Sequence, residues 1–554
     1  MIAVLAREEE YAVIGEFFEL FKTPWQRYSA NSTFDVLICS NDRFCNSSAR
    51  LVLVFGIRQQ TFDQKNGIKV RSERSNRILV YKGDRIPIYG TSFAFENSRG
   101  HDLVDENTGE AIAVEFVSAE QVIVRIGFDL FAEIENLLTR GQPMTHASIP
   151  TLELHIAMLR DIILSYAIPL VEIPSAPAGH KLIVCLTHDV DHAGIRNHRF
   201  DHTFFGFVYR ATIGSVIDLL KGKRHLRQVL QNWKTVISLP LVYLRIVPDF
   251  WANFSRYLVI EKQLPSTFFV IPRKGDPGAN GGSRRRYRRA AAYELSEIRD
   301  EIQKIKSSGC EVGLHGIDAW VEPAKAIEEA KLVGAATGET VKGVRMHWLY
   351  FSEETPLVLQ EAGMIYDSTL GYNETIGYRN GTTQVFRLPG VEQTVELPMH
   401  VMDTAMFYPD HMNLSPERAE RLLDQLIQNC VRFGGVLTIN WHDRSIAPER
   451  LWDGFYRTLL DKLRAAGAWF ATAADCVDWF KKRRLIRFED ISSLDQGALT
   501  ELLAMPTNTP PLKLRKLGGN SVDKPFYNSL RLAPDQQERE MSETLPAQAV
   551  SANR

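Results

Sequence analysis

A cluster of acidic and imidazole side chains directly follows an apolar segment near residue 185. In the run "KLIVCLTHDVDHAG", the apolar stretch ends in His188, Asp189, Asp191 and His192. Isolated buried carboxylates are costly unless they are paired or bound to a metal. Alternate residues of a strand point to the same side, so Asp189 and Asp191 can reach one bound ligand. The segment therefore predicts a metal site or an acid/base site at the end of a strand.

Three later apolar segments also end in side chains that can bind metals or transfer protons. They are "EVGLHGID" with His315 and Asp318, "GVRMHW" with Arg345 and His347, and "NWHD" with His442 and Asp443. The carboxyl ends of the strands of a β/α barrel converge on one mouth. Side chains that are far apart in the sequence can therefore meet in one site.

Alternating strand and helix patterns position these residues. From 181 to 485 we predict an α/β fold, a distorted (β/α) barrel whose strands are "KLIVCLTHDV", "STFFVIP", "EVGLHG", "GVRMHW", "VELPMHVMD", "GGVLTINWH" and "AWFATAADCV". Predicted helices cover 293–309, 323–336, 353–363, 416–433 and 451–466. The first of these repeats apolar residues at helical spacing and ends at Gly309. Repeated β/α units indicate a largely parallel sheet.

Three further regions flank the predicted barrel. Residues 1–145 contain short β-rich runs separated by turn residues, which predicts a smaller mixed α/β module. Residues 146–180 hold an amphipathic helix, "TLELHIAMLRDIILSYA", and a linker, "EIPSAPAG". Residues 506–554 are rich in Pro, Asn, Ser, Gln and Glu, and we expect this tail to be disordered.

A long insertion, residues 193–262, separates the first predicted barrel strand from the second. It is helical and basic, and it contains apolar runs such as "FFGFVYRATIGSVIDLL" and "VISLPLVYLRIV". Basic amphipathic helices pack on their own protein or lie on anionic membrane surfaces. We expect packing on the barrel rim or the N-terminal module, with peripheral membrane contact as the alternative. No nucleic-acid reader motif accompanies this charge or the second basic cluster, "RRRYRR", so no nucleic-acid partner is expected.

The composition describes a soluble globular protein with more than one domain. The chain has 554 residues, of which 45% are hydrophobic, and a net charge of −2 that indicates no charged partner. The six cysteines form no CxxC pair, so neither a disulfide framework nor a zinc ribbon is expected. The first 20 residues carry acidic side chains where a secretory signal is apolar, and no run of 18 apolar residues is present. We therefore expect a cytoplasmic protein without a transmembrane segment.

Taken in order, the motifs resemble those of the polysaccharide deacetylase family, the NodB-homology carbohydrate esterases. "THDVD" resembles the family's paired-Asp strand end, "STFFVIP" its second strand and "EVGLHG" its histidine strand. "GVRMHW" resembles the arginine motif, "YDSTLGY" the following Asp motif and "LTINWHD" the closing strand. The resemblance covers roughly residues 181–480. It implies a distorted β/α barrel that uses a divalent metal ion, here expected to be zinc, to hydrolyse N-acetyl groups of sugars.

The resemblance also implies catalytic roles. Asp189 is expected to be the general base and His442 the general acid that protonates the leaving amine. Arg345 is expected to keep Asp189 ionised and oriented. Asp367, from "YDSTLGY", is expected to orient His442.

The expected metal site departs from the family pattern at one position. Asp191 and His315 match family ligands, but Ala319 stands where the family has a second histidine. Catalytic zinc sites usually have three protein ligands. His347 and Asp318 are the two candidate replacements, and the sequence leaves the choice between them open. Neighbouring strand residues point to opposite faces, which leaves two weaker candidates, His188 and His192.

The residue pattern supports two functions of different classes. The first is a metal-dependent hydrolase that removes N-acetyl groups from an intracellular saccharide intermediate of polysaccharide biosynthesis. The second is a non-catalytic saccharide-binding or scaffold homologue of the same fold. Ala319 favours the second function, whereas the presence of Asp189, Arg345 and His442 together opposes it. Structural roles also exist for single residues, since a DxD pair can cap a helix and a histidine can belong to a core.

Overall fold

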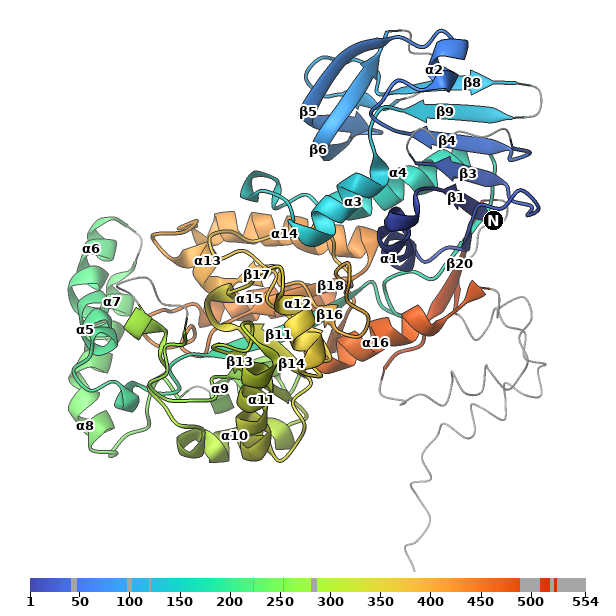
Figure 1. Cartoon of the computed structure of the whole chain (residues 1–554). Helices are drawn as coiled ribbons and strands as arrows, with labels where there is room; N and C mark the ends of the chain where they lie inside the picture. Colours follow the sequence, from blue (N-terminus) through green and yellow to red (C-terminus); the bar gives the residue numbers. More distant parts are fainter. Residues whose placement is uncertain are drawn as a thin grey trace, which may run out of the picture.

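The strands of the chain form four sheets. The computed structural model describes residues 1–40, 47–96, 102–118, 121–222, 224–252, 254–279, 286–488, 509–518 and 523–525. Within these ranges there is a nine-stranded sheet, a six-stranded sheet and two three-stranded sheets. The nine-stranded sheet carries the predicted site residues, and the six-stranded sheet belongs to the N-terminal module at the top right of Figure 1.

The nine-stranded sheet confirms the predicted parallel barrel. Its order is β16–β15–β14–β13–β12–β11–β18–β17, with β19 also paired to β11, and all its ladders are parallel. The strands are β11 (Leu182–Val190), β12 (Thr267–Val270), β13 (Glu311–Gly316), β14 (Gly343–Met346), β15 (Tyr366–Asp367), β16 (Val395–Glu396), β17 (Val401–Met402), β18 (Val436–Asn440) and β19 (Ala468–Ala471). Among the described residues no ladder joins β16 to β17, so the barrel is open between them.

Amphipathic helices cover the outside of this sheet (Figure 1). They are α10 (Arg299–Ser307), α11 (Pro323–Thr337), α12 (Thr355–Glu361), α14 (Pro416–Phe433), α15 (Asp453–Ala465) and α16 (Ala473–Leu485). In α14, the Ser415 side chain caps the first turn by accepting a hydrogen bond from the Arg418 backbone N–H. Leu423, Leu426 and Cys430 of the same helix are buried in the barrel core. This burial fixes α14 against the sheet that carries the site residues.

Two predicted strands are wrong in their extent. The segment "VELPMHVMD" forms two short strands, β16 and β17, because the intervening residues turn the chain between ladders on opposite edges of the sheet. The segment "AWFATAADCV" ends as a strand at Ala471. Thr472 then caps α16, with its side chain accepting from the Asp475 N–H.

The N-terminal module has a core of its own. Its main sheet has the order β2–β1–β3–β4–β9–β8 and comprises β1 (Ile2–Leu5), β2 (Trp25–Arg27), β3 (Val36–Cys39), β4 (Leu51–Phe55), β8 (Ala113–Val117) and β9 (Val122–Ile126). A long hairpin, β5 (Val70–Tyr81) and β6 (Asp84–Phe95), and the helices α1 (Tyr11–Phe21) and α3 (Leu130–Thr139) complete it. The helix expected at 151–167 is α4 (Thr151–Ser165), and its buried Leu159 and Ile162 join this core.

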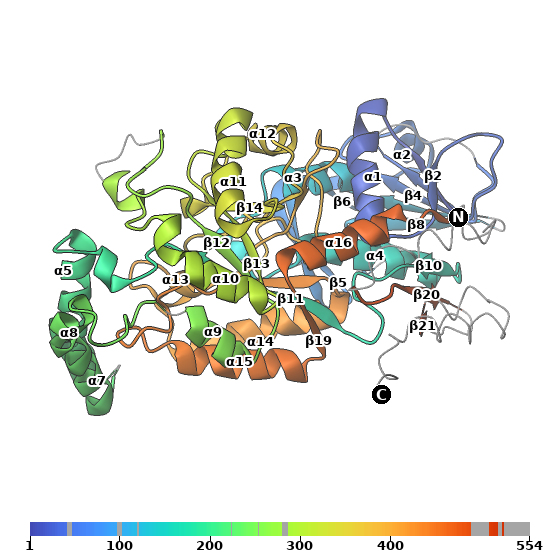
Figure 2. The same cartoon turned by 90° about the horizontal axis from the view of Figure 1, so that it is seen from below.

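The insertion forms a separate helical lobe at the end of the barrel farthest from the N-terminal module (Figures 1 and 2). Its elements are α5 (His202–Tyr209), a π-helical turn (Arg210–Gly214), α6 (Ser215–Leu220), α7 (Leu226–Ile237) and α8 (Leu239–Tyr243). The next helix, α9 (Phe254–Glu261), packs in the barrel core. The Asp249 carboxylate accepts hydrogen bonds from the backbone N–H groups of Ile195 and Arg196. The entry and exit of the lobe are therefore tied together beside β11.

Part of the C-terminal tail is ordered, which corrects our expectation of disorder over 506–554. Lys513–Leu517 forms β20, which pairs antiparallel with β10 (Leu170–Glu172) and with β21 (Asp523–Pro525). Leu512 and Leu514 are buried against α16 and its neighbours. The segment "PPLKLRKL" thus pairs with β10, a strand outside the tail, so the tail sequence alone does not predict this order. The rest of the predicted tail lies outside the described residues.

Candidate active site

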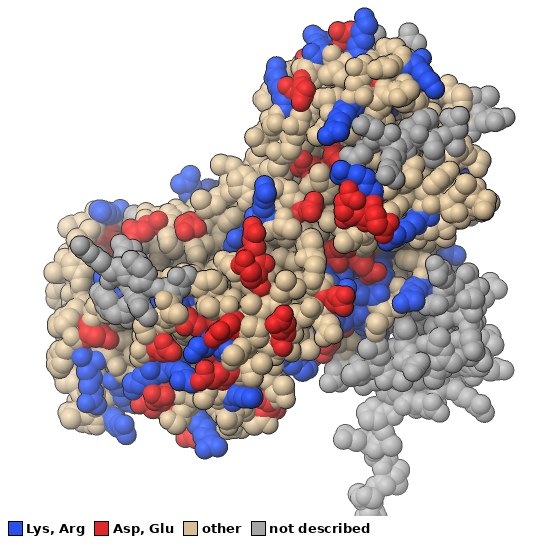
Figure 3. Space-filling view, in the orientation of Figure 1, with Lys and Arg blue, Asp and Glu red and all other residues tan. Residues whose placement is uncertain are grey.

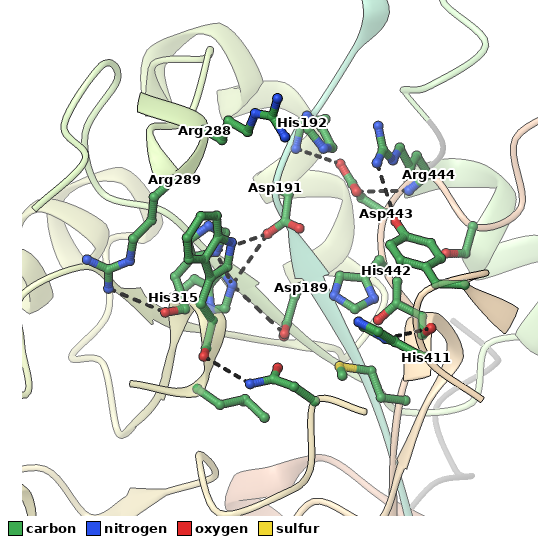
Figure 4. A pocket seen from close by; sticks show the side chains of 18 of the residues that line it. Asp189, Asp191, His192, Arg288, Arg289, His315, His411, His442, Asp443 and Arg444 are labelled. Carbon is green, nitrogen blue, oxygen red and sulfur yellow. Dashed lines mark hydrogen bonds and ion pairs between the residues drawn. The ribbon is translucent and has the colours of Figure 1, made fainter. Parts of the chain in front are cut away.

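The sheet brings the predicted residues to one cavity of about 270 Å³ at the carboxyl ends of its strands. Asp189 lies near the end of β11 and Asp191 directly follows that strand, while His315 pairs in register with Arg345 on the neighbouring strand β14. Figure 4 shows Asp189, Asp191, His315 and His442 directed at the same space. Asp189 and His442 therefore meet in one site, although more than 250 residues separate them in the sequence.

Asp191, His315 and His347 form a group with metal-site geometry. One ligand atom from each lies within 4.8 Å of the others. Asp191 Oδ1 is 3.4 Å from His315 Nε2 and 3.3 Å from His347 Nδ1. The other ring nitrogen of His315, Nδ1, lies 2.9 Å from the carbonyl oxygen of Arg345, to which it can donate. That contact leaves the lone pair of Nε2 available for a metal ion in the space that Nε2 shares with Asp191 Oδ1 and His347 Nδ1.

The remaining metal-ligand candidates face elsewhere. Asp318 lies beside Arg289, with 3.8 Å between Oδ1 and Nη1, and its Oδ2 accepts a hydrogen bond from the Ala279 N–H. His188 points to the opposite face of β11, where Nε2 is 2.9 Å from Glu261 Oε1. His192 lines the cavity, but its Nδ1 contacts His198 Nε2 at 3.1 Å. Of the two main candidates that the sequence left open, the structure brings His347 to Asp191 and His315.

Asp189 is held by a dense set of donors at the base of the cavity. Arg345 Nη1 donates to Asp189 Oδ1 at 3.0 Å, and Asn440 Nδ2 donates to Oδ2 at 2.8 Å. Arg345 is itself fixed, because its guanidinium also donates to Thr187 and to Ser368. Burial alone would raise the pKa of Asp189, but the charges of Arg345, His315 and His442 lower it below the ordinary carboxyl value. Asp189 is therefore ionised at neutral pH.

His442 is oriented by Asp403, and not by Asp367 as expected. Asp403 Oδ1 lies 2.6 Å from His442 Nδ1, and Asp403 Oδ2 accepts the His442 backbone N–H at 2.7 Å. Burial alone would lower the pKa of His442, but the carboxylates of Asp403, Asp191 and Asp189 raise it to about 10. Asp403 thus keeps the imidazole protonated with a fixed ring orientation.

Asp367 has a different environment from the one that we expected. It lies in register with Glu396 on the adjacent strand and accepts a hydrogen bond from the Thr369 hydroxyl. Burial raises its pKa to about 7. Because β15 ends at Asp367, the side chain stays under the site, near Arg345, while β17 delivers Asp403 to the mouth.

A strained turn after β14 shapes one wall of the cavity. Trp348 and Leu349 follow His347 with φ of +65° and +54°, in the left-handed region that non-glycine residues rarely adopt. The turn directs His347 towards Asp191 and leaves Trp348 on the wall of the cavity, 38% exposed. The Trp348 ring stacks on the His347 ring, with centroids 5.8 Å apart. The wall therefore offers an aromatic face next to the metal-site group.

Basic side chains line the rest of the rim (Figure 4). Arg288 and Arg289 lie on one side of the cavity and Arg444 on the other. Arg444 and Arg450 both donate to the hydroxyl of Tyr408, at 3.4 Å and 2.9 Å. Burial alone would raise the pKa of Tyr408, but Arg450 and Arg444 lower it to about 8. The rim therefore has an excess of positive charge that the net charge of the chain does not reveal.

Sequence reasoning missed Asp403, Asn440 and Tyr408. Asp403 is the last residue of the predicted strand "VELPMHVMD", and Asn440 precedes Trp441 and His442 in "NWHD", so the strand-end rule could have found both. Tyr408 follows the short helix α13 (Asp403–Phe407) and has no comparable signal.

The chain is similar to solved structures, whereas no protein-family model and no curated protein sequence matches it. A protein assigned as a polysaccharide deacetylase from Mycobacterium smegmatis is 18% identical, with a TM-score of 0.35, over 57% of this chain and 97% of that one. One from Pseudomonas aeruginosa PAO1 is 14% identical, with a TM-score of 0.37, over 57% and 96%. The PuuE allantoinase is 14% identical, with a TM-score of 0.33, over 55% and 92%. The solved structures to which the chain is similar thus include two described as polysaccharide deacetylases.

Proposed function

We propose that this protein is a metal-dependent hydrolase that removes N-acetyl groups from a saccharide. The observation that carries the proposal is one arrangement: Asp191, His315 and His347 converge beside an Arg345-bound carboxylate and an Asp403-bound histidine. A site that only binds saccharides has no need for an ionised base and a protonated acid on the two sides of a metal-ligand group.

The donor set fits a divalent metal ion. Asp191 Oδ1 is buried and accepts no hydrogen bond within the described part of the chain. A buried carboxylate oxygen of this kind is costly unless a cation binds it. Two imidazoles and one carboxylate are a common ligand set for catalytic zinc. When bound there, the ion would lower the pKa of a water molecule and polarise the acetyl carbonyl.

The chain's own groups divide the proton transfers between them. Asp189 can accept the proton of the attacking water because Arg345 and Asn440 hold it ionised and fixed. Asp403 stabilises the protonated ring of His442, which can donate its proton to the amine as the C–N bond breaks. Arg345 acts through Asp189 and is a positioning residue.

The substrate that fits best is an acetamido sugar with an anionic group. The Trp348 ring offers an apolar face of the kind on which sugar rings pack. Arg288 and Arg444 on the rim favour a phosphate or carboxylate elsewhere on the saccharide. An intermediate of polysaccharide biosynthesis meets both requirements. A cytoplasmic location is in line with the free cysteines Cys185, Cys310, Cys430 and Cys476 of the described residues.

Release of acetate tests this proposal. The zinc-loaded protein would be incubated with N-acetylated mono- and oligosaccharides, with and without a phosphate group, and acetate would be measured. Asp189→Asn should lower the rate by about 10²–10⁴-fold, the usual contribution of a general base. Asp318→Asn is the matched control, because Asp318 faces away from the group, and it should retain most of the activity. Metal-loaded protein that binds these saccharides and releases no acetate would favour the non-catalytic function.

A further inference from the structure

The helical lobe carries most of the exposed apolar side chains of the described residues. Of the 22 large apolar side chains that are exposed in the described part of the chain, 13 lie between residues 200 and 246. These are Phe200, Phe205, Tyr209, Ile213, Ile217, Leu220, Leu226, Leu230, Trp233, Ile237, Leu241, Leu244 and Ile246. An exposed apolar surface this concentrated marks an interaction site.

The exposed residues form stripes at helical spacing. Along α5 and α6 they recur at 205, 209, 213, 217 and 220, and along α7 at 226, 230, 233 and 237. Intervals of three and four residues place each set on one helix face. The opposite faces are buried, with Phe207 and Ala211 packed in a cluster with Leu239, Val242 and Trp251. The lobe is therefore folded, with one apolar face inside and a second one outside.

The same surface has an excess of exposed positive charge. Exposed basic residues between 199 and 247 are Arg199, Lys221, Arg227, Lys234 and Arg245. The two acidic residues of this stretch are partly buried and paired, Asp201 with His198 and Asp218 with Arg224. Figure 3 shows Lys and Arg side chains at the lower left of the molecule, where Figure 1 places the lobe. A partner of this face must tolerate both apolar contact and positive charge.

A membrane interface meets both conditions, and a membrane span does not. The helix His202–Leu220 is long and apolar enough to cross a bilayer by length and composition, with a mean hydropathy of 1.3. However, Phe207 and Ala211 on its inner side are fully buried against the lobe, so lipid cannot surround it. A helix with one buried side and one apolar outer side flanked by Lys and Arg is suited to lie in the plane of an anionic interface.

We propose that the outer face of α5–α8 docks on an anionic membrane surface beside the active-site mouth. The lobe is joined to the mouth through Trp251, whose ring lies under the Arg444 guanidinium and whose Nε1 donates to Glu449. Docking therefore places the cavity next to lipid headgroups, where a lipid-linked saccharide would present its sugar. The docking itself goes beyond the proposed hydrolase activity and does not depend on it.

Vesicle flotation of the full-length protein tests the docking. Wild type should float with vesicles that contain phosphatidylglycerol, bind phosphatidylcholine vesicles more weakly, and lose binding at high salt. The double substitution Ile213→Glu and Ile237→Glu removes one apolar side chain from each stripe. Binding should fall about a hundredfold, because each buried side chain contributes on the order of a tenfold change.

Val259→Glu is the matched control. Val259 is 72% exposed but lies on α9, outside the stripes, so vesicle binding should be unchanged. Hydrolysis of a soluble acetylated sugar by the double variant should equal that of wild type, since neither isoleucine lines the cavity. The proposal is overturned if wild type does not bind anionic vesicles, or if the double variant binds them equally well. It is also overturned if wild type is an oligomer without vesicle affinity that the double substitution dissociates.

Discussion

The barrel mouth and the helical lobe depart from ordinary protein surfaces in opposite ways. The mouth buries charge, with Asp189 only 3% exposed and Arg345 fully buried. The lobe exposes apolar side chains, with Phe200 77% and Ile237 75% exposed. Buried charges and large exposed apolar patches are both rare in soluble proteins. Stability of the fold therefore explains neither feature, and each region indicates a functional role.

The two regions differ in what offsets the cost of the buried charges and of the exposed apolar side chains. In the mouth, most buried charges have partners within the chain, as Asp189 has Arg345 and His442 has Asp403. On the lobe, the outer apolar stripes stay exposed among the described residues, and an external surface would have to cover them. Substitutions in the mouth should therefore act on folding and catalysis together, whereas substitutions on the outer face of the lobe should leave folding intact.

Arg345→Met should have one of the two largest effects on stability. It leaves the Asp189 carboxylate buried without its cation, which typically costs about 3–5 kcal/mol in free energy of unfolding. Arg432→Met is the matched control, because its pair with Asp84 lies at the surface and should contribute less than about 1 kcal/mol. Chemical denaturation measures both variants, and equal losses would break the distinction between buried and exposed charge.

Two phenylalanines on α5 sharpen the contrast within the lobe. Phe207→Ala empties a fully buried position and should lower the free energy of unfolding by about 3–5 kcal/mol. Phe205→Ala changes a side chain that is 57% exposed and should stay within about 0.5 kcal/mol of wild type. Thermal melts of the two variants compare these positions directly. A large loss for Phe205→Ala would show that the outer face is covered by the protein itself.

Truncation after residue 505 should have an intermediate effect. It removes β20 with the buried Leu512 and Leu514, and it leaves Trp479 Nε1 without the Pro510 carbonyl. We expect a loss of about 3 kcal/mol, since each buried leucine contributes roughly 1.5–3 kcal/mol. Vesicle binding through the lobe should be unaffected. A melting temperature equal to that of the full chain would show that β20 adds nothing to the fold.

Asp403→Asn should change the pH dependence more than the fold. Asp403 raises the pKa of His442, and the general acid works only while the ring is protonated. Activity is lost as pH rises through this pKa, so the variant should lose activity at a pH about one unit lower or more. A pH–rate profile measures the shift. An unchanged alkaline limb would mean that His442 is not the acid.

The sequence predicted the barrel and most of its mouth for a simple reason. The end of a strand can be located from the pattern of neighbouring residues in the sequence, and parallel strands bring their carboxyl ends together. Asp189, Asp191, His315, Arg345 and His442 were found in this way. Asp403 was missed although it ends the predicted strand "VELPMHVMD", because the sequence does not show that the end of this segment pairs with β18, the strand before His442.

Other features depend on three-dimensional partners that no local pattern contains. His347, and not Asp318, is placed as the third candidate ligand by the left-handed turn at Trp348. No glycine in the sequence indicates that turn. The tail strand β20 forms because β10 offers an edge 340 residues earlier in the chain. The lobe was expected to pack against the protein. Its sequence places basic residues on and between apolar helices, and only the fold shows which side is exposed.

The metal content of the purified protein tests the central claim most directly. Wild type, His347→Ala and Asp318→Ala would be loaded with zinc, desalted and measured by mass spectrometry for metal per chain. The geometry predicts one ion per chain in wild type and Asp318→Ala, with His347→Ala losing it because a three-ligand site becomes a two-ligand one. Wild type without metal at any loading, or metal retained by His347→Ala and lost by Asp318→Ala, would contradict the account.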